Sequence, residues 1–452
     1  MKLLKITSII LFFTILITPL CYFNLETDSV SAIDNRMLTE NPFTLEGDLT
    51  NNIQSYVNDR IGFRDEMITA YTVLNDRVFG KMVHPSYTYG KDDYVFGAGI
   101  TTENAFGDYH IAFADMVAEI QTYCTDRNVP FLFVFNPAKP AVYQDKIADG
   151  VNYNREWVDL FFTELDKRNI NYLDNTQTLA KLRENGIDGF NQKFDANHWN
   201  DLGAYYGTKA MLERMSQICD GIHVNELDEF LISEKQETSL LVSKFPINEF
   251  VPNNSLNISA SSLYNDYFPE IEINNSYRGF GYYVNTSDSV KGTPRVLVFQ
   301  GSYMNGHGLK YMINAFEEYV HVHDYQNVLN FPYYFNIFQP ECVIFEVAEY
   351  TISNGYFNYD NMKQVDYNPP LSSLEEDMYK SVSYEKDDIS IEKGNTLTKI
   401  TWYTDQTYQY VWITMDGYYY DMQKADGGYT VTIETKRYES SKDCLKIYGS
   451  RA

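Results

Sequence analysis

The sequence predicts an α/β fold in which a mainly parallel sheet is flanked by helices. Helical and buried-strand patterns alternate along residues 106–216, and the apolar runs 295–300 and 341–348 have the composition of central strands. Alternation of this kind predicts parallel strands. At 452 residues the chain is longer than one ordinary domain, so we expect one large domain with a smaller appendage.

The chain begins with a segment typical of a targeting signal. Lys2 and Lys5 precede an uncharged apolar run that ends at Phe23. The run is long for a signal-peptide core and just long enough to span a bilayer, and the small-residue sequence Val30-Ser-Ala32 lies far from it. We therefore expect residues 1–32 to be a signal anchor that leaves the main domain extracellular. The alternative is a cleaved signal peptide and a secreted protein.

The elements of the large domain follow in order. Residues 89–96 predict a turn into a short strand. Apolar residues then recur at helical spacing over 106–123, ahead of a buried strand at 129–135. The pattern continues with a helix near 154–167, a strand at 170–174, a helix near 176–184 and a further helix that Asn200 or Asp201 can cap.

Two regions depart from this alternation within a large domain expected to span residues 33–375. Residues 220–290 are rich in Asn and Ser and have weak strand signals, so we interpret them as an insertion or a lid beside the site. Residues 380–452 contain short alternating segments separated by Asp-Gly and Gly-Gly turns. Strands at that spacing predict a small C-terminal β-sandwich.

Composition excludes some classes of partner. The formal net charge of -26 argues against nucleic acid and against an anionic membrane surface, and favours an uncharged polymer as ligand. The 39 tyrosines suit stacking on sugar rings, although composition bias explains them equally well. None of the cysteines has Cys-x-x-Cys spacing, and His321 and His323 lack further ligands nearby in sequence. We expect no metal and no cofactor.

A candidate nucleophile lies where one predicted central strand ends. The run 295–300 stops at Gly301-Ser302 and a helical pattern follows, which places a hydroxyl at the carboxyl end of a sheet. Of the seven histidines, His198 is the one that combines an acid at short spacing with a helix start behind it. Asp195 can fold back to accept one imidazole N–H and leave the other nitrogen facing the serine. The candidate triad is Ser302, His198 and Asp195; the alternatives are a helix-capping serine and a packed histidine.

Acyl transfer would also require hydrogen-bond donors for the oxyanion. The backbone N–H of Ser302 is the natural first donor. A second could come from Asn136, which follows the strand 129–135, or from Asn305. Each asparagine could instead be a turn or cap residue, and the sequence leaves both interpretations open.

Five motifs occur along the chain in a recognisable order. They are Asn35-Arg-Met-Leu38, Asn58-Asp-Arg-Ile-Gly-Phe-Arg64, Tyr89-Gly-Lys-Asp-Asp-Tyr-Val-Phe96, His198-Trp199 and the strand before Ser302. Together they resemble the DHHW family, which is related to the alginate O-acetyltransferases of the SGNH-hydrolase-like superfamily. The resemblance extends over roughly residues 30–370.

The resemblance implies an SGNH-esterase-like fold, export, membrane anchoring through the N-terminal helix, and acetyl transfer to or from an extracellular polysaccharide. Such proteins often act beside a membrane-bound O-acyltransferase that supplies the acetyl group. Ser302 would form the acetyl-enzyme, His198 would act as base and then acid, and Asp195 would orient His198. The chain departs from the family in two places, since Gln300-Gly301 replace the Gly-Asp of a Gly-Asp-Ser motif and the acid stands one residue further from the histidine.

Two functional hypotheses follow. The first is an O-acetyltransferase or acetyl esterase that modifies a cell-surface polysaccharide through an acyl-enzyme. The second is a catalytically inert carbohydrate-binding or scaffold protein of a polysaccharide assembly complex, which the β-rich C-terminal segment would suit. They differ in whether Ser302 can be acylated.

Overall fold

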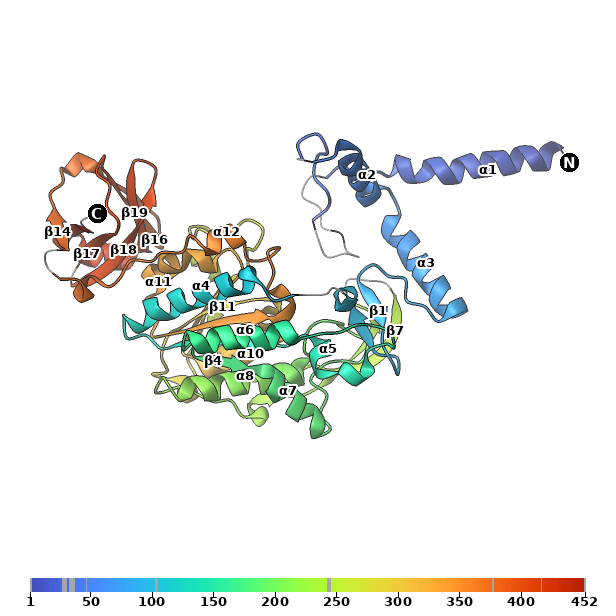
Figure 1. Cartoon of the computed structure of the whole chain (residues 1–452), viewed down its shortest axis with the longest axis horizontal. Helices are drawn as coiled ribbons and strands as arrows, with labels where there is room; N and C mark the ends of the chain where they lie inside the picture. Colours follow the sequence, from blue (N-terminus) through green and yellow to red (C-terminus); the bar gives the residue numbers. More distant parts are fainter. Residues whose placement is uncertain are drawn as a thin grey trace.

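The computed structural model describes residues 2–26, 31, 37–45, 47–101, 105–241, 245–375, 378–415 and 417–450. Part of the expected cleavage sequence at 30–32 and the beginning of the motif at 35–38 lie outside these residues. An α/β body occupies the middle of the molecule, with N-terminal helices at one end and a C-terminal sheet at the other (Figure 1).

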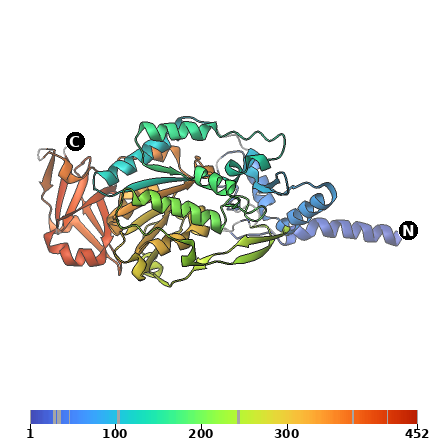
Figure 2. The same ribbon diagram turned by 90° about the horizontal axis from the view of Figure 1, so that it is seen from below.

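Helix α1 (Lys2–Cys21) extends away from the body, and its apolar side chains are exposed (Figure 2). Across the described parts of the chain, no helix combines the length and the hydropathy that crossing a bilayer requires. The expected membrane anchor is therefore not supported. The prediction rested on the absence of charged residues from the apolar run. The second half of the run nevertheless contains the polar residues Thr14 and Thr18 and the helix-breaking Pro19.

Helices α2 (Leu49–Arg60) and α3 (Arg64–Phe79) connect α1 to the body. The Asp59 carboxylate accepts hydrogen bonds from the backbone N–H and the hydroxyl of Thr39, at 2.9 and 2.6 Å. The Arg60 guanidinium donates to the carbonyls of Thr39 and Glu26. These charged side chains thus bind the preceding part of the chain.

The main sheet has seven strands in the order β4-β3-β13-β11-β12-β10-β9. Its members are β3 (Phe131–Asn136), β4 (Tyr172–Asp174), β9 (Ala260–Ser262), β10 (Phe280–Asn285), β11 (Val296–Gln300), β12 (Glu318–His323) and β13 (Cys342–Ala348). The first five strands of that order pair in parallel, and β10 and β9 add an antiparallel edge. The sheet is therefore mixed, with its parallel part where the sequence predicts it.

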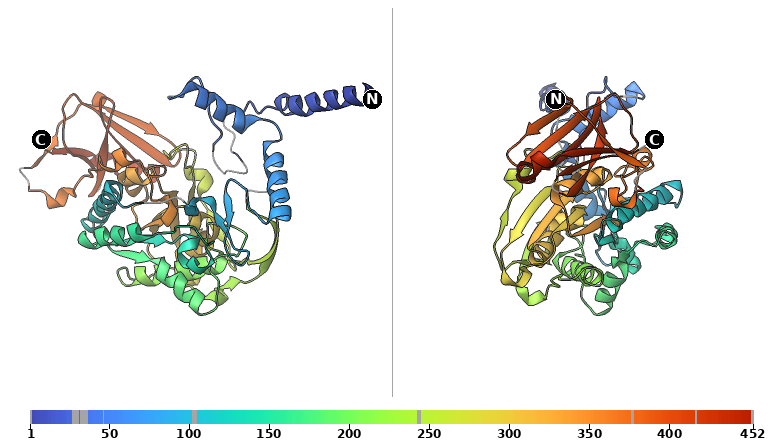
Figure 3. Two further views of the ribbon diagram at one scale, coloured as in Figure 1. Left: turned by 45° about the vertical axis from the view of Figure 1, so that its right-hand side comes forward. Right: turned by 90° about the vertical axis from the view of Figure 1, so that its left-hand side faces the viewer.

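Helices cover both faces of this sheet (Figures 1 and 3). One face packs against α4 (Asp108–Thr125), α6 (Glu156–Lys167) and α11 (Phe331–Phe338), and the other against α7 (Asn175–Glu184), α8 (Asp201–Ser216) and α10 (Leu309–Ala315). Strand β11 sends alternate side chains into the two cores, Leu297 and Phe299 into one and Val296 and Val298 into the other. Because both faces are buried, the strand reads as one continuous apolar run.

Three short two-stranded sheets lie outside the main sheet. They are β1 (Tyr87–Tyr89) with β2 (Val95–Gly97), β5 (Phe230–Leu231) with β8 (Ser255–Leu256), and β6 (Glu234–Ser239) with β7 (Pro246–Pro252). Short helices complete the body: α5 (Lys139–Val142), α9 (Tyr264–Tyr267) and α12 (Tyr359–Met362). Residues 220–290 are thus not merely an insertion, because they also supply β9 and β10 to the main sheet.

The C-terminal strands form one antiparallel sheet, so the prediction of a β-sandwich was wrong. Its order is β14-β20-β17-β18-β19-β16-β15. The members are β14 (Tyr379–Val382), β15 (Ile389–Lys393), β16 (Leu397–Tyr403), β17 (Val411–Met415), β18 (Tyr418–Ala425), β19 (Gly428–Glu434) and β20 (Lys446–Ser450). Helix α13 (Thr435–Ser441) lies between β19 and β20 along the chain. Strand β18 pairs with β17 through Tyr418–Met422 and with β19 through Gln423–Ala425, which curls the sheet around a core of its own. Alternation along a strand predicts a half-buried strand but does not say how many sheets the strands form.

Candidate active site

The candidate serine stands at the carboxyl edge of the parallel strands. Strand β11 ends at Gln300, and Ser302 begins the helical segment that leads into α10. The backbone N–H of Gly301 donates to Glu346 Oε2 on the neighbouring strand β13 at 2.9 Å. The N–H of Ser302 has no hydrogen-bond partner among the described residues. The turn therefore leaves one backbone donor available beside the hydroxyl.

The candidate histidine comes from the loop between α7 and α8. Asp195 has a left-handed backbone conformation, with φ of 50°, and its Oδ1 accepts from the backbone N–H of His198 at 3.1 Å. Asn200 caps α8 by accepting from the N–H of Gly203 at 2.9 Å, as the sequence predicts. The tight turn brings the acid back to the histidine, and the cap fixes where the helix begins.

The three candidate side chains form a continuous hydrogen-bonded chain. His198 Nδ1 lies 2.8 and 2.9 Å from the two carboxylate oxygens of Asp195, and His198 Nε2 lies 2.8 Å from Ser302 Oγ. A carboxylate can only accept hydrogen bonds, so Nδ1 carries the proton and Nε2 accepts from the serine hydroxyl. Burial acts to raise the pKa of Asp195, but the imidazole and the hydrogen bonds of His198 outweigh it, and the pKa is lowered from its usual value. The acid therefore stays ionised at neutral pH.

Tyr350 is a fourth member of this cluster that the sequence analysis missed. Its hydroxyl lies 3.2 Å from Ser302 Oγ and 3.1 Å from His198 Nε2. About a third of the side chain is exposed (36%), but desolvation of the hydroxyl by the surrounding protein raises the pKa of this phenol above its usual value, so it keeps its proton and can donate. The residue follows the end of β13 by two positions, and the carboxyl ends of β13 and β11 meet at one edge. This position, two residues after the end of a predicted central strand, is the feature of the sequence that could have indicated Tyr350.

The two asparagines proposed as oxyanion donors have other surroundings. Asn136 is fully buried, and its amide donates to Glu346 Oε1 at 2.7 Å while its carbonyl accepts from Asn175 at 2.8 Å. Asn136 is therefore committed to a buried network and is not available as the donor. Asn305 accepts from Gln300 Nε2 at 2.6 Å, and no described contact joins its side chain to Ser302.

The residue after the serine explains the His198-Trp199 motif. The hydroxyl of Tyr303 lies 2.8 Å from the carbonyl of Pro137 and 2.7 Å from that of Asn197, and it donates to this pair. The indole N–H of Trp199 donates in return to the carbonyl of Tyr303 at 2.9 Å. These bonds tie the serine turn and the histidine loop directly to each other.

A buried carboxyl group lies beside Gly301, where the sequence lacks the Asp of a Gly-Asp-Ser motif. A Cβ on Gly301 would stand 3.6 Å from both carboxylate oxygens of Asp324, which follows the adjacent strand β12. Asp324 is fully buried, and neither oxygen has a hydrogen-bond partner in the described chain; His323 Nδ1 lies 3.1 Å from Oδ1 but outside hydrogen-bond geometry. Burial raises the pKa of Asp324 to about 6, and burial together with Asp324 raises that of Glu346 to about 8.

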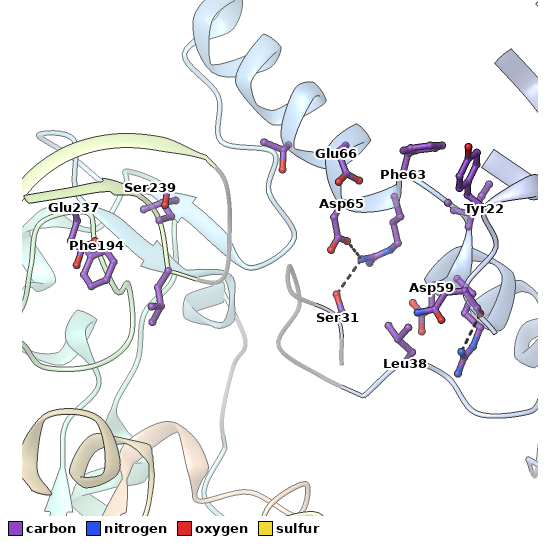
Figure 4. Close-up of a pocket in the computed structure, with 18 of the residues that line it drawn as sticks. Tyr22, Ser31, Leu38, Asp59, Phe63, Asp65, Glu66, Phe194, Glu237 and Ser239 are labelled. Carbon is purple, nitrogen blue, oxygen red and sulfur yellow. Dashed lines mark hydrogen bonds and ion pairs between the residues drawn. The ribbon is translucent and has the colours of Figure 1, made fainter. Parts of the chain in front are cut away.

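Two cavities flank this region. A cavity of about 660 Å³ lies between the N-terminal helices and hairpin β6–β7, with Phe194 on its wall (Figure 4). None of the triad residues lines it, and two of its charged residues, Asp59 and Arg60, are hydrogen-bonded to the preceding chain. The second cavity, of about 1340 Å³, is not lined by the triad residues either, but Tyr350, whose hydroxyl lies 3.2 Å from Ser302 Oγ, is on its wall.

Potential metal ligands do not gather in the part of the chain that the structure describes, since no group of three or more His, Cys, Asp or Glu residues is placed to hold an ion. His321 packs against the rings of Tyr283 and Tyr319, at 6.1 and 5.6 Å between centroids.

Comparison with known proteins is consistent with this geometry. Residues 88–238 match the family model described as the SGNH hydrolase-like domain of the acetyltransferase AlgX. This stretch of the chain is similar to that domain. The matched residues include Asp195 and His198 but end before Ser302. No curated protein sequence matches the chain.

Several solved structures are similar to the chain at low identity. PatB1 of Bacillus cereus is 14% identical, with a TM-score of 0.45 over 59% of this chain and 97% of that chain. The O-acetyltransferase domain of Pseudomonas putida AlgJ is 12% identical, with a TM-score of 0.42 over 65% and 96%. A DHHW family protein from Eubacterium siraeum is 14% identical, with a TM-score of 0.43 over 62% and 95%. Values this low do not bear on activity.

Proposed function

We propose that the protein is an exported O-acetyltransferase or acetyl esterase that modifies a polysaccharide through an acyl-enzyme on Ser302. The observation that carries the proposal is the hydrogen-bonded chain from Asp195 through His198 to Ser302, with both links at 2.8 Å. Its position at the carboxyl edge of a parallel sheet is where α/β proteins place their sites. The relation to the AlgX domain supports acetyl transfer as the chemistry.

In the first step, Ser302 Oγ attacks the carbonyl carbon of an acetyl ester. His198 Nε2 takes the hydroxyl proton as the new C–O bond forms, and Asp195 stabilises the resulting imidazolium through Nδ1. When the tetrahedral intermediate collapses, the bond to the donor oxygen breaks and His198 returns the proton to that oxygen. The product is an acetyl group on Ser302 and a free donor alcohol.

In the second step, a hydroxyl group attacks the acetyl-enzyme. His198 removes its proton, the acetyl group moves to the incoming oxygen, and the proton returns to Ser302 Oγ. A sugar hydroxyl makes the reaction a transfer, and water makes it a hydrolysis. Both reactions use the same three side chains, so the choice between them depends on which nucleophile reaches the acetyl group first.

The oxyanion of each tetrahedral intermediate requires donors positioned before the reaction. The backbone N–H of Ser302 has no partner among the described residues and stands next to the reacting oxygen. We assign the second donor to the Tyr350 hydroxyl, which lies 3.2 Å from Ser302 Oγ. Asn136 is excluded by its bonds to Glu346 and Asn175.

The cavity beside Tyr350 is the proposed entry of the carbohydrate acceptor. Aromatic and amide side chains share its wall, which is the combination that suits the faces and hydroxyls of sugar rings. They include Phe106, Asn152, Tyr153, Asn154, Trp157, Tyr350 and Tyr356. We propose a membrane-bound O-acyltransferase as the source of acetyl groups, on the resemblance to the DHHW family alone.

The proposal is tested by mass spectrometry after incubation with p-nitrophenyl acetate. We expect an acetyl adduct on Ser302 in the natural protein and no adduct in Ser302→Ala, which removes one oxygen atom from a helix start and leaves the fold intact. If neither protein is labelled and p-nitrophenol release equals that of buffer, the acyl-enzyme proposal fails. A non-catalytic carbohydrate-binding role would then be the better interpretation.

A further inference from the structure

The backbone just before Asp195 is held by a single carboxylate from a distant part of the chain. Glu249 on β7 accepts hydrogen bonds from three successive backbone N–H groups: Gln192 at 2.7 Å, Lys193 at 3.0 Å and Phe194 at 2.6 Å. Successive N–H groups that converge on one point form an anion-binding concavity. Here the anion is supplied by the protein itself.

The same backbone is held from the other side by a buried lysine. Lys139, in α5 just after β3, is fully buried, and its ammonium group donates to the carbonyls of Gln192 at 3.0 Å and Val95 at 2.6 Å. Burial lowers the pKa of Lys139 to about 7, although Glu249 and Asp195 oppose the decrease. A lysine is buried at this cost only where its hydrogen bonds are needed.

The two contacts act on the residues that determine where Asp195 stands. Asp195 follows Phe194 directly and adopts a left-handed conformation that a non-glycine residue holds only when its surroundings enforce it. Neither Glu249 nor Lys139 is within hydrogen-bond distance of Ser302 or His198 in the described structure. Their influence on the site therefore passes through the loop.

We propose that Glu249 and Lys139 are positioning residues for His198, and that hairpin β6–β7 is an arm whose docking through Glu249 completes the active site. The inference rests on the proposed roles of Ser302, His198 and Asp195. Hairpin β6–β7 lies beside the histidine loop, and Glu237 and Ser239 of the hairpin appear next to Phe194 in Figure 4. Release of the arm frees three N–H groups and lets Asp195 turn away from the imidazole.

The test is Glu249→Gln, with Glu237→Gln as a matched control. Glu237 lies directly opposite Glu249 in the register of the same hairpin, but its carboxylate pairs with Lys235 at 2.8 Å and makes no described contact with the loop. An amide cannot accept three N–H groups and brings an extra donor towards them. We expect kcat/KM for p-nitrophenyl acetate to fall about 10-fold in Glu249→Gln and less than about 2-fold in Glu237→Gln.

A second measurement distinguishes positioning from general loss of structure. The NMR resonance of the proton on His198 Nδ1, which is hydrogen-bonded to Asp195, is expected to move upfield in Glu249→Gln because this hydrogen bond is lost, and to stay unchanged in Glu237→Gln. Equal rates and equal resonance positions in the two variants would overturn the proposal. If Glu249→Gln does not fold, Glu249→Asp keeps the charge but is one methylene shorter, and a smaller shift of the resonance is expected there.

The NMR measurement does not depend on catalysis. If the natural protein is not acetylated on Ser302, the proposed function fails, while an upfield shift of the His198 Nδ1–H resonance in Glu249→Gln still supports the positioning role. If acetylation occurs but the resonance and the rate of Glu249→Gln match those of Glu237→Gln, the function stands and the positioning role fails.

Discussion

The serine side and the histidine side of the candidate site are held in different ways. Ser302 follows a strand that is hydrogen-bonded on both edges, so the sheet itself places the hydroxyl. His198 stands on a loop whose position depends on side chains from α5, β7 and the turn after Ser302. The first arrangement tolerates loss of a single contact, because many ladder bonds remain. The second relies on a few contacts between segments far apart in sequence, and each of them can be removed by one substitution.

The largest expected effect is on the histidine side, in Asp195→Asn. The amide can donate to Nδ1, which favours the tautomer with the proton on Nε2, and that tautomer cannot accept the serine proton. We expect kcat/KM for p-nitrophenyl acetate to fall roughly 1000-fold or more, with little change in the thermal unfolding midpoint. A decrease below about 10-fold would mean that Asp195 does not orient the histidine.

The next effect is expected at Tyr350, which contacts both sides. Tyr350→Phe removes a hydroxyl that lies 3.2 Å from Ser302 Oγ and leaves the ring in place. Loss of one oxyanion donor lowers kcat by about 100-fold, and a similar fall is expected here with KM little changed. If KM rises while kcat stays the same, Tyr350 binds the acceptor and is not the oxyanion donor.

On the serine side, the expected effect of a substitution at Asp324 is on the pH dependence of the free energy of unfolding. Because the pKa of Asp324 is raised to about 6 in the folded protein, the neutral acid favours folding at low pH, and this contribution is lost as the pH rises from about 4 towards 6. Asp324→Asn stays neutral at every pH and gives up no hydrogen bond that the carboxylate makes. We expect its free energy of unfolding to exceed that of the natural chain by about 3 kcal/mol at pH 8 and to equal it near pH 3.5, measured by urea denaturation. A constant difference across this range would contradict the buried charge.

The smallest expected effect is at the start of α8. Asn200→Ala removes the side chain that accepts from the N–H of Gly203, and loss of such a cap costs about 1 kcal/mol. Urea denaturation should show this decrease in the free energy of unfolding. Asn185→Ala provides the comparison, because Asn185 is an exposed asparagine at the C-terminal cap of the preceding helix α7. A kcat/KM that falls more than about 5-fold in Asn200→Ala would show that the cap also positions His198.

The elements of the parallel sheet could be predicted from local patterns. Buried strands such as β11 and β13 read as apolar runs because both faces are covered, and α8 begins at the predicted cap because an asparagine satisfies the free N–H groups of a helix start. The prediction of a C-terminal β-sandwich was wrong because local patterns do not determine how strands assemble into sheets. Alternating residues record burial on one face, and β18 shows that one strand can serve two halves of a curved sheet.

The candidate site was partly predictable. The Asp195-to-His198 spacing and the serine after β11 are local features, and the structure joins these three residues by hydrogen bonds. Asn136 was misjudged because its partners Glu346 and Asn175 come from other elements, and Tyr350 was missed because its contact with Ser302 spans 48 positions of sequence.

By itself, the sequence determined which residue types stand at the ends of the strands and in the loop before α8, since propensity, capping and periodicity act within a few neighbouring residues. Only the tertiary structure decided which of these residues meet. Glu249, Lys139 and Asp324 have no local signal, because each gains its role from backbone groups or side chains that folding brings to it from another part of the chain. Hydrogen bonding and desolvation act over a few ångströms in space, and the separation of two residues along the sequence does not show whether folding brings them that close.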